Sequence, residues 1–171
     1  MHPEALTSDT RKLWPALRHF QGFVLAGGTA LALQIGHRIS VDFDFFSERE
    51  IEPGLLTKVE GVFKRAAVTT VLNTPEQLTV RVDGTNLTFL TYRFPPIDDP
   101  IVYEGVRLFT VPDIAATKAY ALGRRATLKT TLIFTSSWRR VIARSPPLRL
   151  SPRRNTGISL THDCFSSSSC I

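Results

Sequence analysis

The sequence predicts an α/β (α+β) fold, a small mixed β-sheet flanked by helices, over residues 1–129. Three observations predict it. Short runs of β-branched, aromatic and other apolar residues alternate with segments in which apolar residues recur at helical spacing. The composition, 43% hydrophobic and 21% charged, is that of an ordinary globular protein. A chain of 171 residues is long enough to bury one hydrophobic core.

In the first part of the chain, up to residue 47, the sequence pattern predicts two helices and two strands. Apolar residues at helical spacing predict a helix over residues 9–20, with Pro15 either near its start or breaking it. GFVLA at 22–26 is typical of a short buried strand, and the glycines that follow turn it into a second helix, TALALQIGH at 29–37. ISVDFDFFS at 39–47 is rich in β-branched and aromatic residues, which favours another strand.

The second part predicts a helix, a group of three strands, and a strand followed by a final helix. In chain order these are a helix at 53–67, strands at 67–72, 78–82 and 87–92, a proline-rich loop at 94–100, a strand at 106–111 and a helix at 112–125. Asp83-Gly84, between the second and third strands, is typical of a tight hairpin turn. Asp113 lies in the first turn of the last helix, where a negative charge stabilises the helix dipole.

The net charge of +6 comes mainly from the C-terminal part of the chain. Residues 130–171 contain six arginines and one acidic residue, whereas residues 1–129 contain 15 Lys+Arg and 14 Asp+Glu. The same tail is rich in serine and proline, contains both cysteines, and shows no sustained apolar period. Such a composition cannot bury enough surface to fold by itself. We therefore predict an incomplete domain at 1–129 and an irregular, disordered basic tail at 130–171.

No apolar run is long enough to cross a membrane, and the N-terminus lacks the basic-then-apolar pattern of a secretory signal. We therefore expect a cytoplasmic protein without membrane association.

Two aspartates interrupt the apolar strand at 39–47. Because alternate residues of a strand face the same side, Asp42 and Asp44 project together, opposite Val41, Phe43 and Phe45. Two carboxylates about 7 Å apart repel each other unless a cation lies between them, and oxygen-only ligation selects Mg²⁺ or Mn²⁺. Taken alone, a D-x-D pattern is more often a solvated strand face.

Gly27, Gly28 and Thr29 open the second helix. Glycines let a phosphate approach the backbone, a helix N-terminus presents free N–H groups, and the Thr29 hydroxyl adds a donor. A lone GGT is usually only a turn. A phosphate-binding turn beside a metal-binding acid pair is, however, the combination that phosphoryl or nucleotidyl transfer requires.

The stretch GGTALALQIGHRISVDFDFF, residues 27–46, resembles a motif of the AbiEii/AbiGii toxin family of nucleotidyltransferases, G-G-[ST]-A-L followed by H-R-x-S-x-D-x-D-x-F. The resemblance implies a DNA polymerase β-like nucleotidyltransferase fold, Mg²⁺ held by Asp42 and Asp44, and a nucleoside triphosphate (NTP) bound at the GGT turn. It also implies an RNA acceptor, tRNA especially, a cognate antitoxin protein, and a role in phage defence by abortive infection.

The resemblance extends to four further residues. Lys118 matches a family lysine that contacts the nucleotide, although a solvated helix lysine is the equal alternative from the residues alone. His37 and Arg38 stand at the H-R positions, where they would place the triphosphate or, equally, cap the helix. Ser40 would bind nucleotide or only form a hydrogen bond at the start of the strand.

One expected motif is missing. The resemblance implies K-D-[YF]-x-D-[LI]-Y-F-[LI]-L-E after the lysine helix, whereas residues 129–139 are KTTLIFTSSWR. The strand at 87–92 also lacks the third carboxylate of many related enzymes. Starting from the third base of the Lys129 codon, degenerate codons for this segment can encode D-Y-L-D-I-Y-F-I-L-E. We hypothesise a frameshift after Lys129; the alternative is a genuine, divergent basic RNA-binding tail.

The predicted function is transfer of a nucleotide from an NTP to RNA by Mg²⁺-dependent in-line displacement, with Asp42, Asp44 and Lys118 as catalytic residues. One alternative is a catalytically impaired remnant that binds nucleotide or antitoxin without turnover. Another is an RNA-binding protein that uses its arginine-rich tail.

The frameshift hypothesis predicts a second reading frame in the encoding DNA. Sequencing the gene should show an uninterrupted frame that begins at the Lys129 codon and encodes the acidic motif. A gene without that frame would establish residues 130–171 as genuine sequence.

Overall fold

The computed structural model describes residues 1–124, so the predicted domain boundary at Lys129 and the tail at 130–171 lie outside the described residues. The helices, in chain order, are the 3-10 helix η1 (Pro3–Ala5) and the α-helices α1 (Ser8–Leu17), α2 (Gly27–Ile35), α3 (Leu55–Val62) and α4 (Val111–Arg124). The strands are β1 (Val24–Ala26), β2 (Phe43–Ser47), β3 (Val68–Asn73), β4 (Gln77–Val82), β5 (Thr85–Thr91), β6 (Ile101–Tyr103) and β7 (Val106–Leu108).

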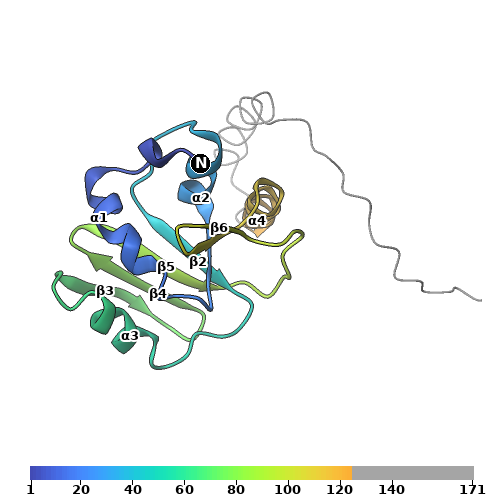
Figure 1. Ribbon diagram of the computed structural model, residues 1–171. Helices are drawn as coiled ribbons and strands as arrows, with labels where there is room; N and C mark the ends of the chain where they lie inside the picture. The colour runs from blue at the N-terminus through green and yellow to red at the C-terminus, as the bar shows by residue number, and fades with distance from the viewer. Residues whose placement is uncertain (125–171) are drawn as a thin grey trace, which may run out of the picture.

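The strands of this part of the chain form one seven-stranded mixed sheet with the order β3-β4-β5-β2-β1-β7-β6 (Figure 1). β1 pairs antiparallel with β2 and parallel with β7, and β2 pairs parallel with β5. The predicted α/β class with a mixed sheet is therefore confirmed. None of the helices in residues 1–124 is long and apolar enough to span a membrane.

Two hairpin turns use residues with positive φ, as tight two-residue turns require. Asp83 (φ 46°) and Gly84 (φ 87°) join β4 to β5, as predicted. Glu104 (φ 49°) and Gly105 (φ 81°) join β6 to β7. The sequence pattern did not predict β6, because three residues are too few to show a period.

The strand predicted at 39–47 is shorter than expected. β2 begins only at Phe43, and Val41, expected on the core side, is exposed. The physical reason lies in the N-terminal segment: Ser40 donates its N–H to the carbonyl of Ala5 (2.8 Å) and forms an isolated bridge with Leu6. These contacts hold the residues before β2 away from the main sheet.

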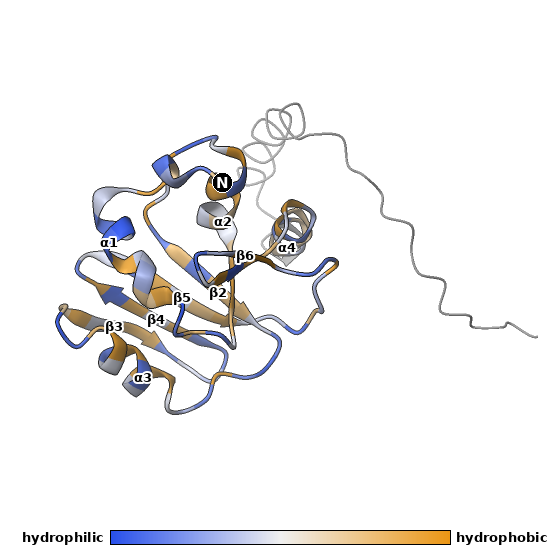
Figure 2. Cartoon of the chain, in the orientation of Figure 1, coloured by the Kyte–Doolittle hydropathy of each residue, from blue (hydrophilic) through white to orange (hydrophobic). Residues whose placement is uncertain are grey.

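One face of the sheet carries the main aromatic core, under α1. Phe43 and Phe45, on β2, are fully or almost fully buried. The ring of Phe20 contacts those of Phe45 and Phe89 at centroid distances of 6.2 and 5.0 Å, and Trp14 of α1 contacts Phe43 at 6.0 Å. Figure 2 shows the corresponding pattern of apolar strands joined by hydrophilic loops. Burial of these large rings provides the main favourable term for folding.

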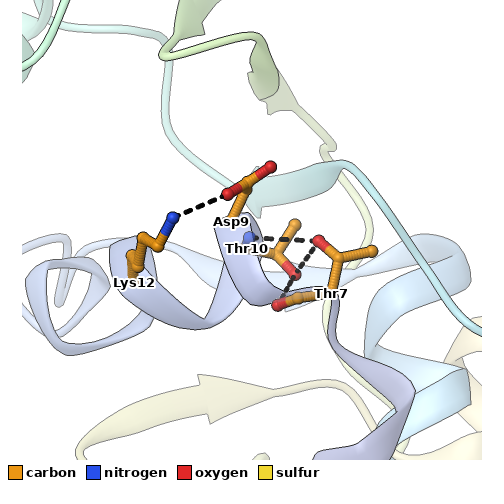
Figure 3. A network of polar contacts seen from close by, with 4 residues as sticks. All are labelled: Thr7, Asp9, Thr10 and Lys12. Carbon is orange, nitrogen blue, oxygen red and sulfur yellow. Dashed lines mark hydrogen bonds and ion pairs between the residues drawn. The ribbon is translucent and has the colours of Figure 1, made fainter.

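Helix α1 begins at a hydrogen-bonded cap (Figure 3). The Thr7 side chain accepts a hydrogen bond from the N–H of Thr10 (3.2 Å), which satisfies one of the free donors of the first turn. Lys12 and Asp9 form an exposed ion pair at 2.9 Å. Pro15 lies inside α1, which ends two residues later, so the predicted helix is not broken at the proline.

The opposite face of the sheet is covered in part by α2 and α4, which pack against each other (Figure 1). Gln34 of α2 donates to the carbonyl of Phe109 (2.8 Å), just before α4. Asp113, in the first turn of α4, accepts from the N–H of Ile97 and from the Thr110 hydroxyl, both at 2.6 Å. These bonds fix α4 and the loop before it over the sheet.

Candidate functional site

The glycine turn and the acid pair meet where β1 ends and β2 begins. The antiparallel register places Ala26, the last residue of β1, opposite Asp44. Gly27, the next residue, has φ +64°, and a Cβ atom added to it would collide with the Asp44 carboxylate. Both the backbone conformation and the available space therefore require glycine at position 27.

Arg38 lies on the other side of the same turn. A Cβ atom added to Gly28 would collide with the Arg38 guanidinium. The first turn of α2 is thus bordered by a carboxylate and by a guanidinium that is exposed to solvent. A helix N-terminus with an arginine beside it is a suitable site for a phosphate group.

The two aspartates differ in their surroundings. Asp42 Oδ1 accepts a hydrogen bond from the N–H of Asn86 at 3.4 Å. Burial raises the pKa of Asp44, and the neighbouring Asp42 raises it further, while the positive charges of Lys118 and Arg38 lower it. Asp42, Arg38 and Lys118 therefore all act electrostatically on Asp44, although Lys118 comes from a distant part of the chain.

Lys118 reaches this site from α4. Its side chain is exposed, and its charge acts on Asp44. No ion pair among residues 1–124 joins Lys118 to a carboxylate within 4.0 Å. The ammonium group therefore acts on Asp44 by its charge without an ion pair to it, which leaves it available to an anionic ligand.

Thr29 and Ser40 connect α2 to the acid pair. The Thr29 hydroxyl donates to the main-chain carbonyl of Asp42 and shares a hydrogen bond with the Ser40 hydroxyl (2.7 Å). Thr29 is 2% exposed and Ser40 is 4% exposed. These contacts favour a positioning role for both hydroxyls over direct contact with phosphate.

His37 follows Gly36, which ends α2 in the left-handed conformation (φ 62°). Its Nδ1 atom is buried without a hydrogen-bond partner among the described residues. Burial and the neighbouring Arg38 both lower the pKa of His37. The imidazole is therefore neutral near pH 7 and would not attract phosphate by charge.

The donor atoms at the acid pair fit a divalent cation that keeps open positions. Within residues 1–124, no group of three or more His, Cys, Asp or Glu side chains is placed to hold a metal ion. Mg²⁺ commonly uses only one or two carboxylates and completes its shell with water and substrate phosphates. On the neighbouring strand β5, the position opposite Asp44 is occupied by Thr88.

The segment that contains the glycine turn and the acid pair matches a sequence-family model, and so do His37, Arg38 and Ser40. Residues 12–92 match the family model described as "Nucleotidyl transferase AbiEii toxin, Type IV TA system". The predicted resemblance to the AbiEii family is confirmed over this segment. Lys118 lies beyond the matched residues.

Individual proteins show the same similarity. The protein aq_aa25 of Aquifex aeolicus (strain VF5) is 34% identical over 109 residues, which are 63% of this chain and 53% of that protein. A crystal structure of a candidate nucleotidyltransferase from H. pylori matches with a TM-score of 0.50 at 21% identity, covering 69% of this chain and 59% of that one. A second, JHP933 from Helicobacter pylori, has a TM-score of 0.49 at 20% identity, covering 66% and 57%. The first structure shows a shared fold, and the chain spans between half and two thirds of the length of these relatives.

The raised pKa of Asp44 predicts a pH-dependent effect on stability. When the pKa of a carboxyl is higher in the folded than in the unfolded state, ionising that carboxyl destabilises the folded protein. The free energy of unfolding therefore decreases as the pH rises from the unfolded-state pKa through the folded-state pKa. Asp44→Asn removes that cost, so the variant should be more stable than wild type at neutral pH without divalent cations. The advantage should shrink as pH falls toward the ordinary pKa of 3.8.

Thermal unfolding in EDTA, from about pH 4 to about pH 8, measures this difference. Asp99→Asn, at an exposed position, is the control and should leave the unfolding temperature nearly unchanged. An Asp44→Asn variant that is less stable than wild type at neutral pH would contradict the prediction.

The hydrogen bonds of Thr29 predict that its hydroxyl stabilises the folded protein. Thr29→Val keeps the shape but leaves the Ser40 hydroxyl and the Asp42 carbonyl without this partner, at a cost of about 1–3 kcal/mol in the free energy of unfolding. Thr29→Ser keeps the hydroxyl and should retain most of the stability. Urea unfolding of the two variants tests this, and equal losses would show that the hydroxyl makes no net contribution.

Proposed function

We propose that this chain is the nucleotide-handling part of a nucleotidyltransferase that transfers a nucleotide from an NTP to an RNA acceptor. One observation carries the proposal: the register of β1 and β2 sets Asp44 against the N-terminus of α2, where Arg38 also lies. Lys118 of α4 acts on the same carboxylate by its charge. The family match, which covers the turn and the acid pair, supports it.

In this proposal the triphosphate binds at the start of α2. The N–H groups of the Gly27-Gly28 turn, which lack helical partners, would donate to phosphate oxygens. Arg38, beside Gly28, would hold the phosphates by charge and by paired hydrogen bonds. Lys118 would approach the same phosphates from α4 as a point charge.

Asp42 and Asp44 would hold Mg²⁺ or Mn²⁺ between them and the triphosphate. When bound, the cation would neutralise the charge that develops during in-line displacement at the α-phosphate. The protein contributes placement: Thr29 and Ser40 hold the backbone of Asp42, and the 3.4 Å hydrogen bond from Asn86 orients its carboxylate. Ligand contacts would also repay the cost of burying the Asp44 charge.

The partners follow from the same family description. The type IV toxin–antitoxin description supports a cognate antitoxin protein as partner. A role in abortive infection and a cytoplasmic location are proposed from the sequence and its resemblance alone. tRNA is the proposed acceptor, by the resemblance set out from the sequence.

A second candidate function is nucleotide binding without turnover. It is favoured by one observation: no third acidic residue joins Asp42 and Asp44 within residues 1–124. A site with two metal ligands can bind an Mg²⁺–NTP complex, yet it lacks a further carboxylate to act as a general base or an additional metal ligand.

A transfer assay with labelled NTPs, total tRNA and Mg²⁺ separates these functions. Asp42→Ala should lower transfer by on the order of a hundredfold or more, and EDTA should abolish it, because charge stabilisation at the phosphate is lost. Asp99→Ala, which removes an exposed carboxylate elsewhere, should leave transfer unchanged. Transfer that persists in Asp42→Ala would overturn the proposed role of the acid pair. NTP binding without any transfer by wild type would select the second candidate.

A further inference from the structure

A cavity of about 420 Å³ lies on the same face of the sheet as Asp44. Phe46 lines it and is two residues beyond Asp44 on β2, so both side chains point to this face. Their Cα atoms are separated by about 7 Å along the strand. The volume falls within the range of small-molecule sites in proteins, about 300–1,000 Å³.

Four of the residues that line the cavity are aromatic: Phe46, Tyr92, Phe94 and Phe109. Phe46 contacts the rings of Tyr92 and Phe109 at centroid distances of 5.3 and 6.0 Å, and Tyr92 contacts Phe94 at 5.2 Å. Phe94 is 47% exposed, which is unusual for a phenylalanine and leaves part of its ring open to a ligand. Flat aromatic walls are suited to a ligand that is itself a flat ring.

Polar groups border the aromatic part. Arg49 and Arg107 line the cavity, and within residues 1–124 Glu48 is its one acidic lining residue. Arg107 is half-buried and donates to the carbonyl of Gln21 (3.4 Å). A ligand with an aromatic ring and a polar edge, rather than a purely apolar one, matches this lining.

The cavity continues a line that starts at the glycine turn. Ala26, the residue before the glycine turn, pairs with Asp44. Two residues earlier on β1, Val24 pairs with Phe46, and both of these residues line the cavity. The turn, the acid pair and the cavity therefore occur in that order along two paired strands. An NTP has the same order of parts: phosphates, the reacting α-phosphate, and then the nucleoside.

We propose that this cavity is the binding site for the nucleoside of the donor NTP, with its base stacked on Tyr92 and Phe94. The inference rests on the proposed function, because it takes the glycine turn as the phosphate site. Helix α4 links the two ends of the ligand: Lys118 acts on Asp44, while Tyr120 contacts the rings of Tyr92 and Phe94.

Equilibrium binding of two probes to the full chain in the presence of Mg²⁺ tests the site. One probe is an NTP, used with each of the four bases in turn, and the other is inorganic tripolyphosphate, which has no nucleoside. Phe94→Ala should weaken the binding of at least one NTP by about fivefold or more, since a stacking contact is lost, and should leave tripolyphosphate binding unchanged. Ile97→Ala, in the same loop, is the matched control: Ile97 is 64% exposed and does not line the cavity.

The outcomes separate this inference from the proposed function. If wild type binds tripolyphosphate as tightly as every NTP, the nucleoside site is overturned while the phosphate site stands. If Phe94→Ala weakens both probes equally, or only weakens RNA binding, the cavity does not hold the donor nucleoside. If wild type binds neither probe, the proposed function fails together with the inference.

Discussion

The pairing of Ala26 with Asp44 is the constraint on which the rest of the site depends. It brings a carboxylate so close to the start of α2 that residue 27 must be glycine, both for its positive φ and for lack of space. A shift of one residue in this register would turn Asp44 to the opposite face and place a phenylalanine beside the turn. One strand pairing thus determines the backbone of the turn, the direction of the acid pair and the composition of both faces of the sheet.

The surrounding structure holds charges that would be unfavourable in isolation. Burial and Asp42 both disfavour the ionised form of Asp44, and only Lys118 and Arg38 offset them. A half-buried, repelling acid pair reduces stability and is typical of a binding or catalytic site. The hydrogen bonds of Thr29 and Ser40 hold the backbone beside this unfavourable charge, and those of Asp113 fix the start of α4 to the loop before it.

The aromatic residues of β2 and β5, and Tyr92 directly after β5, have different surroundings on the two faces of the sheet. On one face, Phe45 and Phe89 are fully or almost fully buried and form the core with Phe20. On the other, Phe46 and Tyr92 are only partly buried and line the cavity beside the acid pair. The strand alternation that stabilises the fold therefore also provides part of the lining of the proposed nucleoside site.

The sequence by itself determined the class of fold and the residue types of the site. Local patterns suffice for this, since periodicity predicts helices and strands, and Gly27-Gly28 and Asp42-x-Asp44 are contiguous motifs. They could not predict β6, which is too short to show a period, or the late start of β2, which results from Ser40 bonding to Ala5. Contacts between distant segments were decided only by tertiary packing: Lys118 near Asp44, the inward hydroxyls of Thr29 and Ser40, and the cavity. The physical reason is that strand register and helix docking follow from burial and hydrogen bonding across the whole chain, which no local pattern contains.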